Sequence, residues 1–182
     1  MPKDAIREDD ATSSVTFREP MTEDGAAIFE LVRQCKPLDE NSRYCNLIQA
    51  DHFSETCVVA ELDGDVVGWV SGHMIPGEDA FFVWQVAVSP KARGMGLGGR
   101  MLRHLAGRQA CLSATMLKTT ITEDNGASWA MFESFARSIG GELTDTTPHF
   151  EEDVHFDGEA ATEHMVSITI PRPTAPGLHV VA

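Results

Sequence analysis

The residues Arg93-Gly-Met-Gly-Leu-Gly-Gly99 have the types and spacing to bind an anion through backbone N–H groups. Glycine adopts positive φ and brings the backbone close to a ligand, and the first N–H groups of a helix have no partner within it. An apolar run from Phe81 to Val88 precedes the turn and predicts a buried strand. An amphipathic helix is predicted at about 96–109. A strand, a glycine turn and a helix start in this order indicate a phosphate-binding loop.

Two common phosphate-binding loops are excluded by their spacing. A P-loop needs Gly-x-x-x-x-Gly-Lys-Ser/Thr, and no lysine follows these glycines directly. A dinucleotide-binding turn needs Gly-x-Gly-x-x-Gly and an acidic residue about 20 positions later. Here the glycines are Gly94, Gly96 and Gly98, and residues 112–120 contain no acidic residue. A glycine-rich helix start without a ligand remains the alternative interpretation.

Cysteine and histidine spacing predicts neither a metal site nor a redox pair. The seven histidines form no His-Glu-x-x-His pattern, and Cys35, Cys45, Cys57 and Cys111 form no Cys-x-x-Cys pair. Residues 1–10 lack the apolar core of a secretory signal, and no apolar run is long enough for a membrane span. We therefore expect a cytoplasmic protein with free thiols and without a metal.

The distribution of charge favours a polyanionic ligand over nucleic acid. The net charge of −14 would repel a nucleic acid. Six of the 14 lysine and arginine residues nevertheless lie between Lys91 and Lys118, around the glycine turn. The region between Arg137 and Arg172 contains eight acidic residues and no lysine or arginine. The acidic residues within 142–163 either form a solvated face or attract a cationic substrate.

The sequence pattern predicts one domain over residues 15–170, between a disordered arm at 1–14 and a proline-rich tail at 171–182. Turn signals at Asp63-Gly64 and Pro76-Gly77 join three strands into an antiparallel meander. The predicted order of elements is β-α-α-β-β-β-α-β-α-β-β. This order indicates an α/β (α+β) fold with a mixed central sheet of about six or seven strands, flanked by four helices.

The segment Arg93-Gly-Met-Gly96-Leu-Gly98 resembles motif A of the Gcn5-related N-acetyltransferases (GNAT), Arg/Gln-x-x-Gly-x-Gly/Ala. The predicted order of elements is also similar to that of this superfamily. The resemblance implies the GNAT acyl-CoA N-acyltransferase fold, in which the glycine loop holds the pyrophosphate of acetyl-CoA. It also implies a local splay between the strands at 81–88 and 115–122, where backbone N–H groups would bond to the cofactor and the developing oxyanion. The residues expected to bind acetyl-CoA are Val86, Ala87, Val88, Arg93, Gly94, Met95, Gly96, Leu97, Gly98, Gly99 and Asn125.

Further stretches between residues 16 and 170 resemble one branch of this superfamily, the L-2,4-diaminobutyrate acetyltransferases of ectoine biosynthesis. The resemblance implies transfer of acetyl from acetyl-CoA to the γ-amino group (N4) of L-2,4-diaminobutyrate. The product would be N4-acetyl-L-2,4-diaminobutyrate, the precursor that is cyclised to ectoine under osmotic stress. The same resemblance implies a homodimer. The matching stretches are Phe17-Arg-Glu-Pro20, Cys35-Lys-Pro-Leu-Asp-Glu-Asn-Ser-Arg-Tyr44, Val70-Ser-Gly72, Phe82-Val-Trp-Gln-Val-Ala-Val88 and Thr119-Thr-Ile-Thr-Glu-Asp-Asn-Gly-Ala-Ser-Trp129.

An amine must lose its proton before it attacks a thioester, and a pKa of about 10.4 leaves almost none of it neutral at pH 7. A carboxylate or an ordered water can accept that proton. We predict Glu163 and Asp39 as catalytic and substrate-binding acids, and Glu151 as a further candidate; the resemblance places a substrate-binding acid at Glu163. In the alternative, Glu163 is a solvated strand end and Asp39 caps the helix that contains Tyr44. Tyr44, the only tyrosine, and Trp84 would form an aromatic wall for the substrate or belong to the core.

The positions after these motifs differ from the superfamily pattern. Where many members carry a tyrosine that protonates the leaving thiolate, this chain has Phe132. A thiol pKa near 8.5 means that the thiolate leaves without such an acid. Relatives often carry a histidine near the position of Ala160, and His164 would face the other side of its strand. Asn125 would bond to the cofactor or a bridging water, or would form a turn.

No cysteine adjoins the cofactor motif, which favours direct amine attack in a ternary complex over an acetyl-enzyme. Two other functions remain open. The enzyme could acetylate another small amine, such as a polyamine, a lysine side chain or an aminoglycoside. The chain could also be a regulatory module that binds CoA without transferring acetyl. Equal turnover of diaminobutyrate, ornithine and lysine would favour the first, and cofactor binding without thiol release would favour the second.

Overall fold

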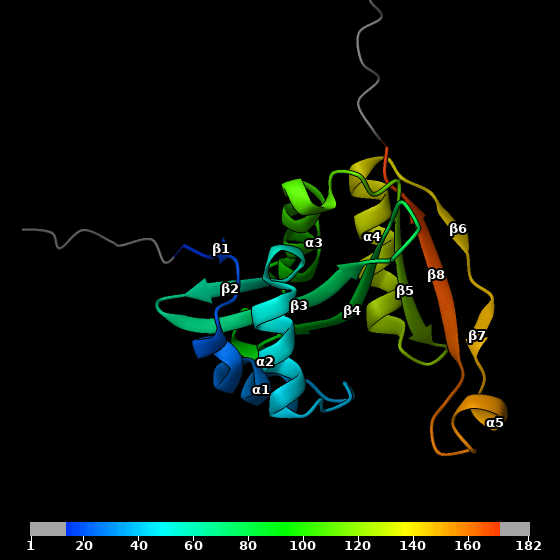
Figure 1. The fold of residues 1–182 in the computed structure, drawn as a ribbon, viewed down its shortest axis with the longest axis horizontal. Coiled ribbons are helices and arrows are strands. Elements are labelled where there is room, and N and C mark those ends of the chain that lie inside the picture. Colours follow the sequence, from blue (N-terminus) through cyan, green and yellow to red (C-terminus); the bar gives the residue numbers. More distant parts are fainter. Residues whose placement is uncertain (1–13, 172–182) are drawn as a thin grey trace, which may run out of the picture.

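The structure, a computed structural model, describes residues 14–171 (Figure 1). The predicted arm at 1–14 and tail at 171–182 lie outside this range, except for Ser14 and Pro171. Eight strands form one sheet: β1 (Thr16–Arg18), β2 (Val58–Leu62), β3 (Asp65–Met74), β4 (Ala80–Val88), β5 (Met116–Thr122), β6 (Leu143–Asp145), β7 (Pro148–Phe150) and β8 (Glu163–Thr169). The helices of the described range are α1 (Gly25–Gln34), α2 (Arg43–His52), α3 (Leu97–Ala106), α4 (Gly126–Ile139) and α5 (Glu152–His155).

The predicted architecture, a mixed sheet flanked by helices, is confirmed. The structure adds one strand and one helix, β7 and α5, inside the segment that the sequence predicts as an acidic loop. β7 has three residues and α5 has four. Neither is long enough to show a periodic pattern, so the sequence gives no signal for them.

The strand order places β4 and β5 inside the sheet, next to each other. The order is β1-β2-β3-β4-β5-β8-β6, and β7 also pairs with β8. β2, β3 and β4 pair antiparallel, as the turn signals at Asp63-Gly64 and Pro76-Gly77 predict. β4 and β5 run parallel because α3 forms the crossover between them, and β5 pairs antiparallel with β8.

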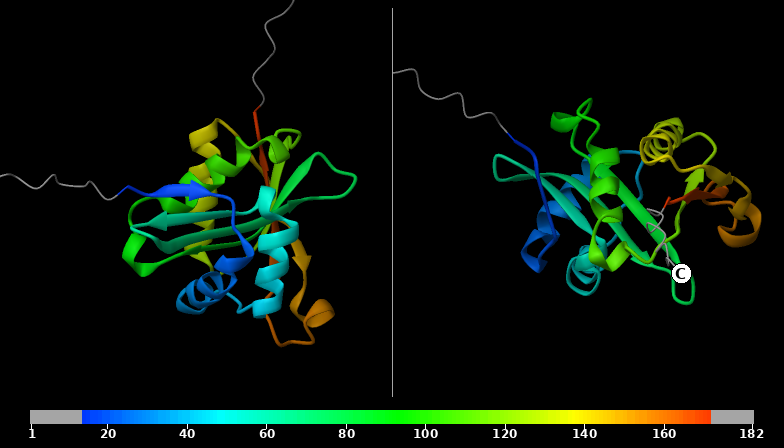
Figure 2. Two further views of the ribbon diagram at one scale, coloured as in Figure 1. Left: turned by 60° about the vertical axis from the view of Figure 1, so that its left-hand side comes forward. Right: turned by 90° about the horizontal axis from the view of Figure 1, so that it is seen from above.

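Two helical layers cover opposite faces of the sheet (Figures 1 and 2). On one face, Leu102 of α3 and Phe135 of α4 share a buried cluster with Val70 of β3. On the other face, Ile28 of α1 shares a second buried cluster with Trp69. Trp69 and Val70 are consecutive residues in different clusters, because side chains alternate between the two faces of a strand.

The α2 helix does not bury the face that its apolar residues predict. The spacing of Tyr44, Leu47 and Ile48 predicts a common buried face, and this is wrong, because Tyr44 is 71 % and Leu47 is 38 % exposed. Ala50 instead joins the buried cluster under α1. Two polar residues, Asn46 and Gln49, are buried together with Ala50. Asn46 shares a helix face with both, because residues three and four positions apart lie on one face.

A bulge in β4 changes which side chains face each layer. Ser71 of β3 lies opposite Gln85, but the next residue, Gly72, lies opposite Val83, so Trp84 is the extra residue of β4. One extra residue reverses the alternation of side chains from that point on. Val83 accordingly packs under α3 and α4, whereas Gln85 faces the segment between α1 and α2.

The central strands β4 and β5 pair over a short distance and then part. Their register runs from Ala80 opposite Met116 to Phe82 opposite Lys118. Beyond it, β4 continues to Val88 without a β5 partner in the register that the structure describes. The predicted splay between these strands is therefore confirmed. Backbone groups of later β4 residues that point toward β5 are left available for a ligand.

Gly72 lies beside the bulge, with no room for a side chain. A Cβ there would be 2.5 Å from the carbonyl oxygen of Phe82 and 2.7 Å from the ring of Phe81. Gly72→Ala should therefore lower the free energy of unfolding by about 1–3 kcal/mol, measured by urea denaturation. Gly107→Ala is the control, because its Cβ would have only ordinary contacts, and its effect should stay below about 0.5 kcal/mol. Equal stability of the two variants would contradict this packing.

Candidate active site

The parting of β4 and β5 opens a cavity of about 500 Å³. Its walls come from β4, β5, the start of α4, the segment between α1 and α2, and the segment that leads into β8. A cavity of this size, with polar groups from several elements, is typical of small-molecule sites. The predicted site residues that line it are Asp39, Trp84, Val86, Asn125 and Glu163, together with Phe132.

Several other predicted residues lie outside the lining of this cavity. Tyr44 projects from the exposed side of α2. The side chain of Ala87 is buried in the cluster under α1, and the carbonyl of Val88 accepts a hydrogen bond from the Cys35 thiol at 3.3 Å. Glu151 precedes α5, where its backbone N–H donates to the ring of His155. The structure therefore brings the two predicted acids, Trp84 and Asn125 together, but not Tyr44 or Glu151.

Glu163 is the first residue of β8 and lies half-buried in the cavity wall. Burial raises the pKa of its carboxyl group, and the charge of Asp39 raises it further. A hydrogen bond with the Thr120 hydroxyl and the neighbouring His164 act in the opposite direction. A raised pKa makes a carboxylate a better proton acceptor, as a general base requires.

Asp39 lies in the exposed segment between α1 and α2 and reaches the same cavity. It does not cap α2, because the hydroxyl of Ser42 accepts the hydrogen bond at the start of that helix, at 3.1 Å. The cap interpretation of Asp39 is therefore wrong. Asp124 and Glu159 also line the cavity, so four carboxylates including Glu163 surround it. Their combined field attracts a cationic amine.

Asn125 caps α4 and also lines the cavity. Its Oδ1 accepts the N–H of Ser128 at 3.1 Å, which caps α4. Its Nδ2 is left as a donor at the cavity wall. Phe132, about two helical turns after Asn125, is buried and lines the same wall without a proton to donate. Ala160 lines the cavity as well, whereas His164 points to the other side of β8 from Glu163.

The glycine turn between β4 and α3 has the backbone conformations that its composition predicts. Gly94 has a φ of 80° and Gly96 a φ of 62°, values that favour glycine. Gly96 is the N-cap of α3, so the N–H groups of Leu97–Gly99 open the helix without helical partners. A Cβ on Gly98 would lie 2.4 Å from the sulfur of Met131, so glycine there lets α3 approach α4. The turn can present a row of N–H groups to a phosphate.

Only part of the basic cluster around this turn is available to an anion. Lys91 and Lys118 form ion pairs with carboxylates, at 3.5 and 2.6 Å. Arg103 donates to a serine hydroxyl of α4, and Arg108 donates to backbone carbonyls. The Arg93 side chain lies exposed in the turn, and its guanidinium forms no hydrogen bond or ion pair with residues from 14 to 171. The Arg100 guanidinium lies over the Phe17 ring, 5.2 Å from its centroid. Arg93 is therefore the cation of this cluster best placed for a ligand at the turn.

Sequence reasoning missed lining residues whose types are common in strands and loops. Asn41, Gln85 and Thr120 line the cavity, and all three lie inside stretches that carry the family resemblance. Glu159 lies in the acidic segment before β8 and also lines the cavity. Their membership of the resembling motifs was the signal that could have identified the first three. Nothing in the sequence distinguishes Glu159 from its acidic neighbours.

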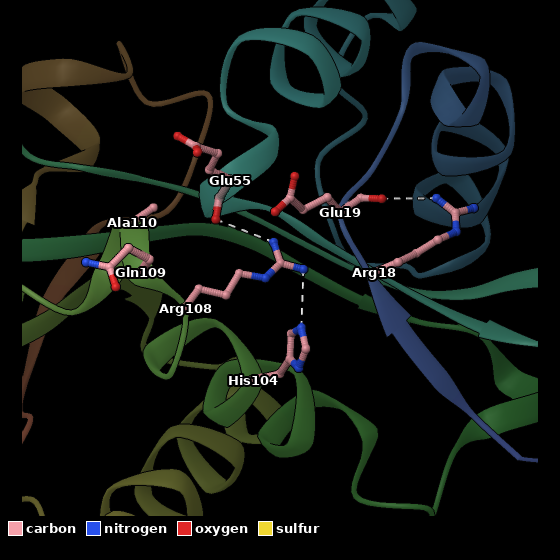
Figure 3. A pocket seen from close by; sticks show the side chains of 7 residues that line it. All are labelled: Arg18, Glu19, Glu55, His104, Arg108, Gln109 and Ala110. Carbon is pink, nitrogen blue, oxygen red and sulfur yellow. Dashed lines mark hydrogen bonds between the residues drawn. The ribbon is translucent and has the colours of Figure 1, made fainter.

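A second cavity, of about 450 Å³, lies beside β1 and the end of α3 (Figure 3). Arg18 lines it and is held by two carboxylates, at 2.7 and 2.9 Å. Figure 3 shows the Arg108 guanidinium between His104 and the backbone of Glu55. Arg18 thus links β1 to the segment before α1 and to β2, and Arg108 is bonded to the segment before β2. Because both arginines are bonded within the protein, this cavity is not the candidate site.

The cysteines are free and three of them are buried: Cys35, Cys57 and Cys111. Burial raises the pKa of each of these thiols, which makes them poor nucleophiles. Within residues 14–171, no group of three or more histidine, cysteine, aspartate or glutamate residues is arranged to hold a metal ion. No helix in the same range is long and apolar enough to cross a bilayer.

The sequence profile of the acetyltransferase (GNAT) family matches residues 25–136, from the start of α1 into α4. The chain is 43 % identical over 163 residues to the L-2,4-diaminobutyric acid acetyltransferase of Vibrio parahaemolyticus, which covers 89 % of this chain and 90 % of that protein. It is 45 % identical over 155 residues to the protein of the same name from Vibrio cholerae, which covers 85 % of this chain and 89 % of that protein.

Solved structures show the same relationship. Diaminobutyrate acetyltransferase EctA from Paenibacillus lautus, in complex with its substrate L-2,4-diaminobutyric acid and coenzyme A, aligns with a TM-score of 0.79. That alignment has 33 % identity and covers 86 % of this chain and 95 % of that one. From the parted strands, the glycine turn and these identities it follows that the chain belongs to the GNAT family of acetyltransferases, in the branch of the L-2,4-diaminobutyric acid acetyltransferases.

Proposed function

We propose that this protein transfers the acetyl group of acetyl-CoA to N4 of L-2,4-diaminobutyrate. The observation that carries the proposal is the cavity between β4 and β5, where Asp39 and Glu163 meet next to the strand that leads into the glycine turn. A thioester lying along β4 and an amine between the two acids would meet in this cavity. Proteins that match most of this chain are named L-2,4-diaminobutyric acid acetyltransferases. One similar solved structure holds this substrate and coenzyme A.

Acetyl-CoA would be held by the backbone rather than by charged side chains alone. The N–H groups of Leu97–Gly99 would bond to its pyrophosphate, and Arg93 would add a positive charge. The pantetheine arm would lie along the edge of β4 that β5 leaves open, beside Val86. The Nδ2 group of Asn125 is a further donor at that edge.

The amine would be bound and deprotonated by the acids on the other walls. Glu163 accepts one proton from the N4 ammonium group, and its raised pKa assists this transfer. Asp39 attracts the ammonium group, and Trp84, which is 53 % exposed, would cover the aliphatic chain. The carboxylates of Asp124 and Glu159 extend the same negative field.

The transfer itself then needs one bond to form and one to break. The neutral N4 nitrogen attacks the thioester carbon, and a β4 backbone N–H near Val86 stabilises the developing oxyanion. The carbon–sulfur bond breaks, and the second proton of the nitrogen passes to the CoA thiolate. A thiol pKa near 8.5 makes a dedicated acid unnecessary, which suits phenylalanine at position 132.

We further propose that the product serves ectoine biosynthesis under osmotic stress, that the enzyme acts in the cytoplasm, and that it forms a homodimer. The support for these three statements is the relationship to the diaminobutyrate acetyltransferases. The acidic residues of the described structure between Arg137 and Arg172 include some at the cavity and some in solvent. Glu159 and Glu163 face the cavity, whereas those of α5 are exposed to solvent.

A steady-state assay with acetyl-CoA and L-2,4-diaminobutyrate tests the proposal directly. We expect release of the CoA thiol and a product whose mass-spectrometric fragments carry the acetyl group on N4. The kcat/KM for diaminobutyrate should exceed those for ornithine and lysine by about tenfold or more, because the cavity fixes the distance between the two amines. Equal turnover of the three would point to another amine, and CoA binding without thiol release would contradict acetyl transfer.

Glu163→Gln should lower kcat by about 10²–10⁴-fold, because the amide cannot accept the ammonium proton. Rates are measured at saturating acetyl-CoA, and circular dichroism checks that the fold is intact. Glu151→Gln is the matched control, because Glu151 lies outside the cavity lining, and it should keep the wild-type rate. Wild-type rates for Glu163→Gln would remove Glu163 from the site.

The same substitution should not destabilise the protein at neutral pH. Burial raises the pKa of Glu163 in the folded state, so the ionised carboxylate destabilises the fold above that pKa. This destabilisation disappears as the pH falls through the folded-state pKa. Glu163→Gln should therefore unfold at an equal or higher temperature than wild type at about pH 7, with a smaller difference at about pH 4. Calorimetry that finds the variant less stable at neutral pH would contradict the assigned environment.

Arg93→Ala should raise the KM for acetyl-CoA by about three- to tenfold and leave the KM for the amine unchanged, since one charge-assisted contact with phosphate is lost. The effect should shrink at high salt, which screens exposed charges. Arg103→Ala is the control, because Arg103 is bonded to Ser138 of α4 at 3.0 Å. Equal effects of the two substitutions would contradict a specific role for Arg93.

A further inference from the structure

Gln85 is a polar side chain in the middle of β4 that is only 6 % exposed. Its Nε2 donates to the backbone carbonyl of Asp39 at 2.9 Å. Its Oε1 accepts from the Nδ2 group of Asn41 at 3.4 Å. One amide therefore connects the strand at the cavity to two residues of the segment between α1 and α2, 46 and 44 positions away in sequence.

Gln85 reaches that segment because of the bulge at Trp84. In a regular strand, side chains two positions apart share a face, so Gln85 would lie on the same face as Val83, under α3 and α4. With the bulge, Gln85 turns to the opposite face and lines the cavity beside Asp39 and Asn41, while Trp84 and Val86 line it as well. The bulge beside the parted strands therefore directs the Gln85 amide toward the segment between α1 and α2.

The segment that Gln85 bonds to has few other strong attachments. Asp39 and Glu40 are exposed, and Leu38 is half-buried against the cluster under α1. The ion pairs of Glu40 with Lys36 and Arg33 are exposed to water, and such pairs contribute little to stability. The two hydrogen bonds of Gln85 are partly buried, and one of them holds the main chain at Asp39. They therefore attach the segment more firmly than these surface contacts do.

We propose that Gln85 is a positioning residue for the amine substrate: it fixes the backbone of Asp39 so that the Asp39 carboxylate stays at the cavity with Glu163. This inference rests on the proposed function, in which Asp39 binds the amine. Neither hydrogen bond of Gln85 involves the glycine turn. Loss of Gln85 should therefore weaken the binding of the amine but not the binding of acetyl-CoA.

The test is Gln85→Met, which keeps the length of the side chain and removes both hydrogen bonds. We expect the KM for L-2,4-diaminobutyrate to rise by about tenfold, while the KM for acetyl-CoA changes by less than about twofold. A selective rise of at least about fivefold supports the inference. A smaller rise, or an equal rise in both KM values, overturns it.

Asn41→Ala removes one of the two bonds from the loop side and leaves the core of β4 intact, so it remains informative if Gln85→Met folds poorly. It should raise the KM for the amine in the same selective way. The double variant should be less impaired than the sum of the two single effects, because both substitutions break the same attachment. Full additivity of the two effects on the amine KM overturns the inference.

Thr56→Val is the matched control for loss of a buried hydrogen bond. The Thr56 hydroxyl donates to the carbonyl of Gly72 at 2.8 Å, away from the segment between α1 and α2. We expect a lower unfolding temperature with both KM values unchanged, which separates a loss of stability from a loss of positioning. The same selective rise in amine KM for Thr56→Val would overturn the inference.

Hydrogen exchange gives a readout that does not depend on the identity of the substrate. In Gln85→Met, backbone amides of residues 36–42 should exchange faster, whereas those of residues 93–99 should be unchanged. If the wild type does not acetylate diaminobutyrate, the proposed function fails, but this comparison still tests the attachment. Unchanged exchange at residues 36–42 overturns the inference whichever amine is used.

Discussion

The candidate active site depends on one feature of the sheet: β4 and β5 pair over only part of their length. Two neighbouring parallel strands would normally satisfy each other's backbone groups along their length. Here the pairing stops at Phe82, six residues before β4 ends, and the bulge at Trp84 follows directly. The result is an open strand edge inside a sheet whose two faces are covered by helices. That edge offers backbone N–H groups to a ligand at the point where strand β4 leads into the glycine turn.

The chemistry is divided between the two sides of this opening. The turn and the start of α3 provide backbone donors and one exposed arginine, Arg93, which suits a phosphorylated carrier. The opposite walls provide carboxylates, and burial raises the pKa of Glu163 while the charge of Asp39 raises it further. Holding an ionised acid in this setting costs stability, a common feature of catalytic sites. The buried amide of Gln85 connects the wall that carries Asp39 to the strand itself.

The sequence was sufficient to predict the strand–turn–helix unit and the meander of β2 to β4, because periodicity and glycine mark them. Family motifs also pointed to Asp39 and Glu163, which the structure places at one cavity. It was not sufficient for the face of α2, since tertiary packing at Ala50 outweighed the apolar spacing of Tyr44 and Leu47. It also missed β7 and α5, which are too short to have a pattern. The role of Gln85 depends on a one-residue bulge, and no local sequence signal reports a register shift between two strands.

The most direct measurement of the central claim is a crystal structure of the protein with coenzyme A and L-2,4-diaminobutyrate bound. The structure predicts the pantetheine arm between β4 and β5, the pyrophosphate at Leu97–Gly99, and the N4 nitrogen within hydrogen-bonding distance of Glu163. A complex in which β4 and β5 pair along their full length, or in which the amine binds away from Asp39 and Glu163, would contradict it.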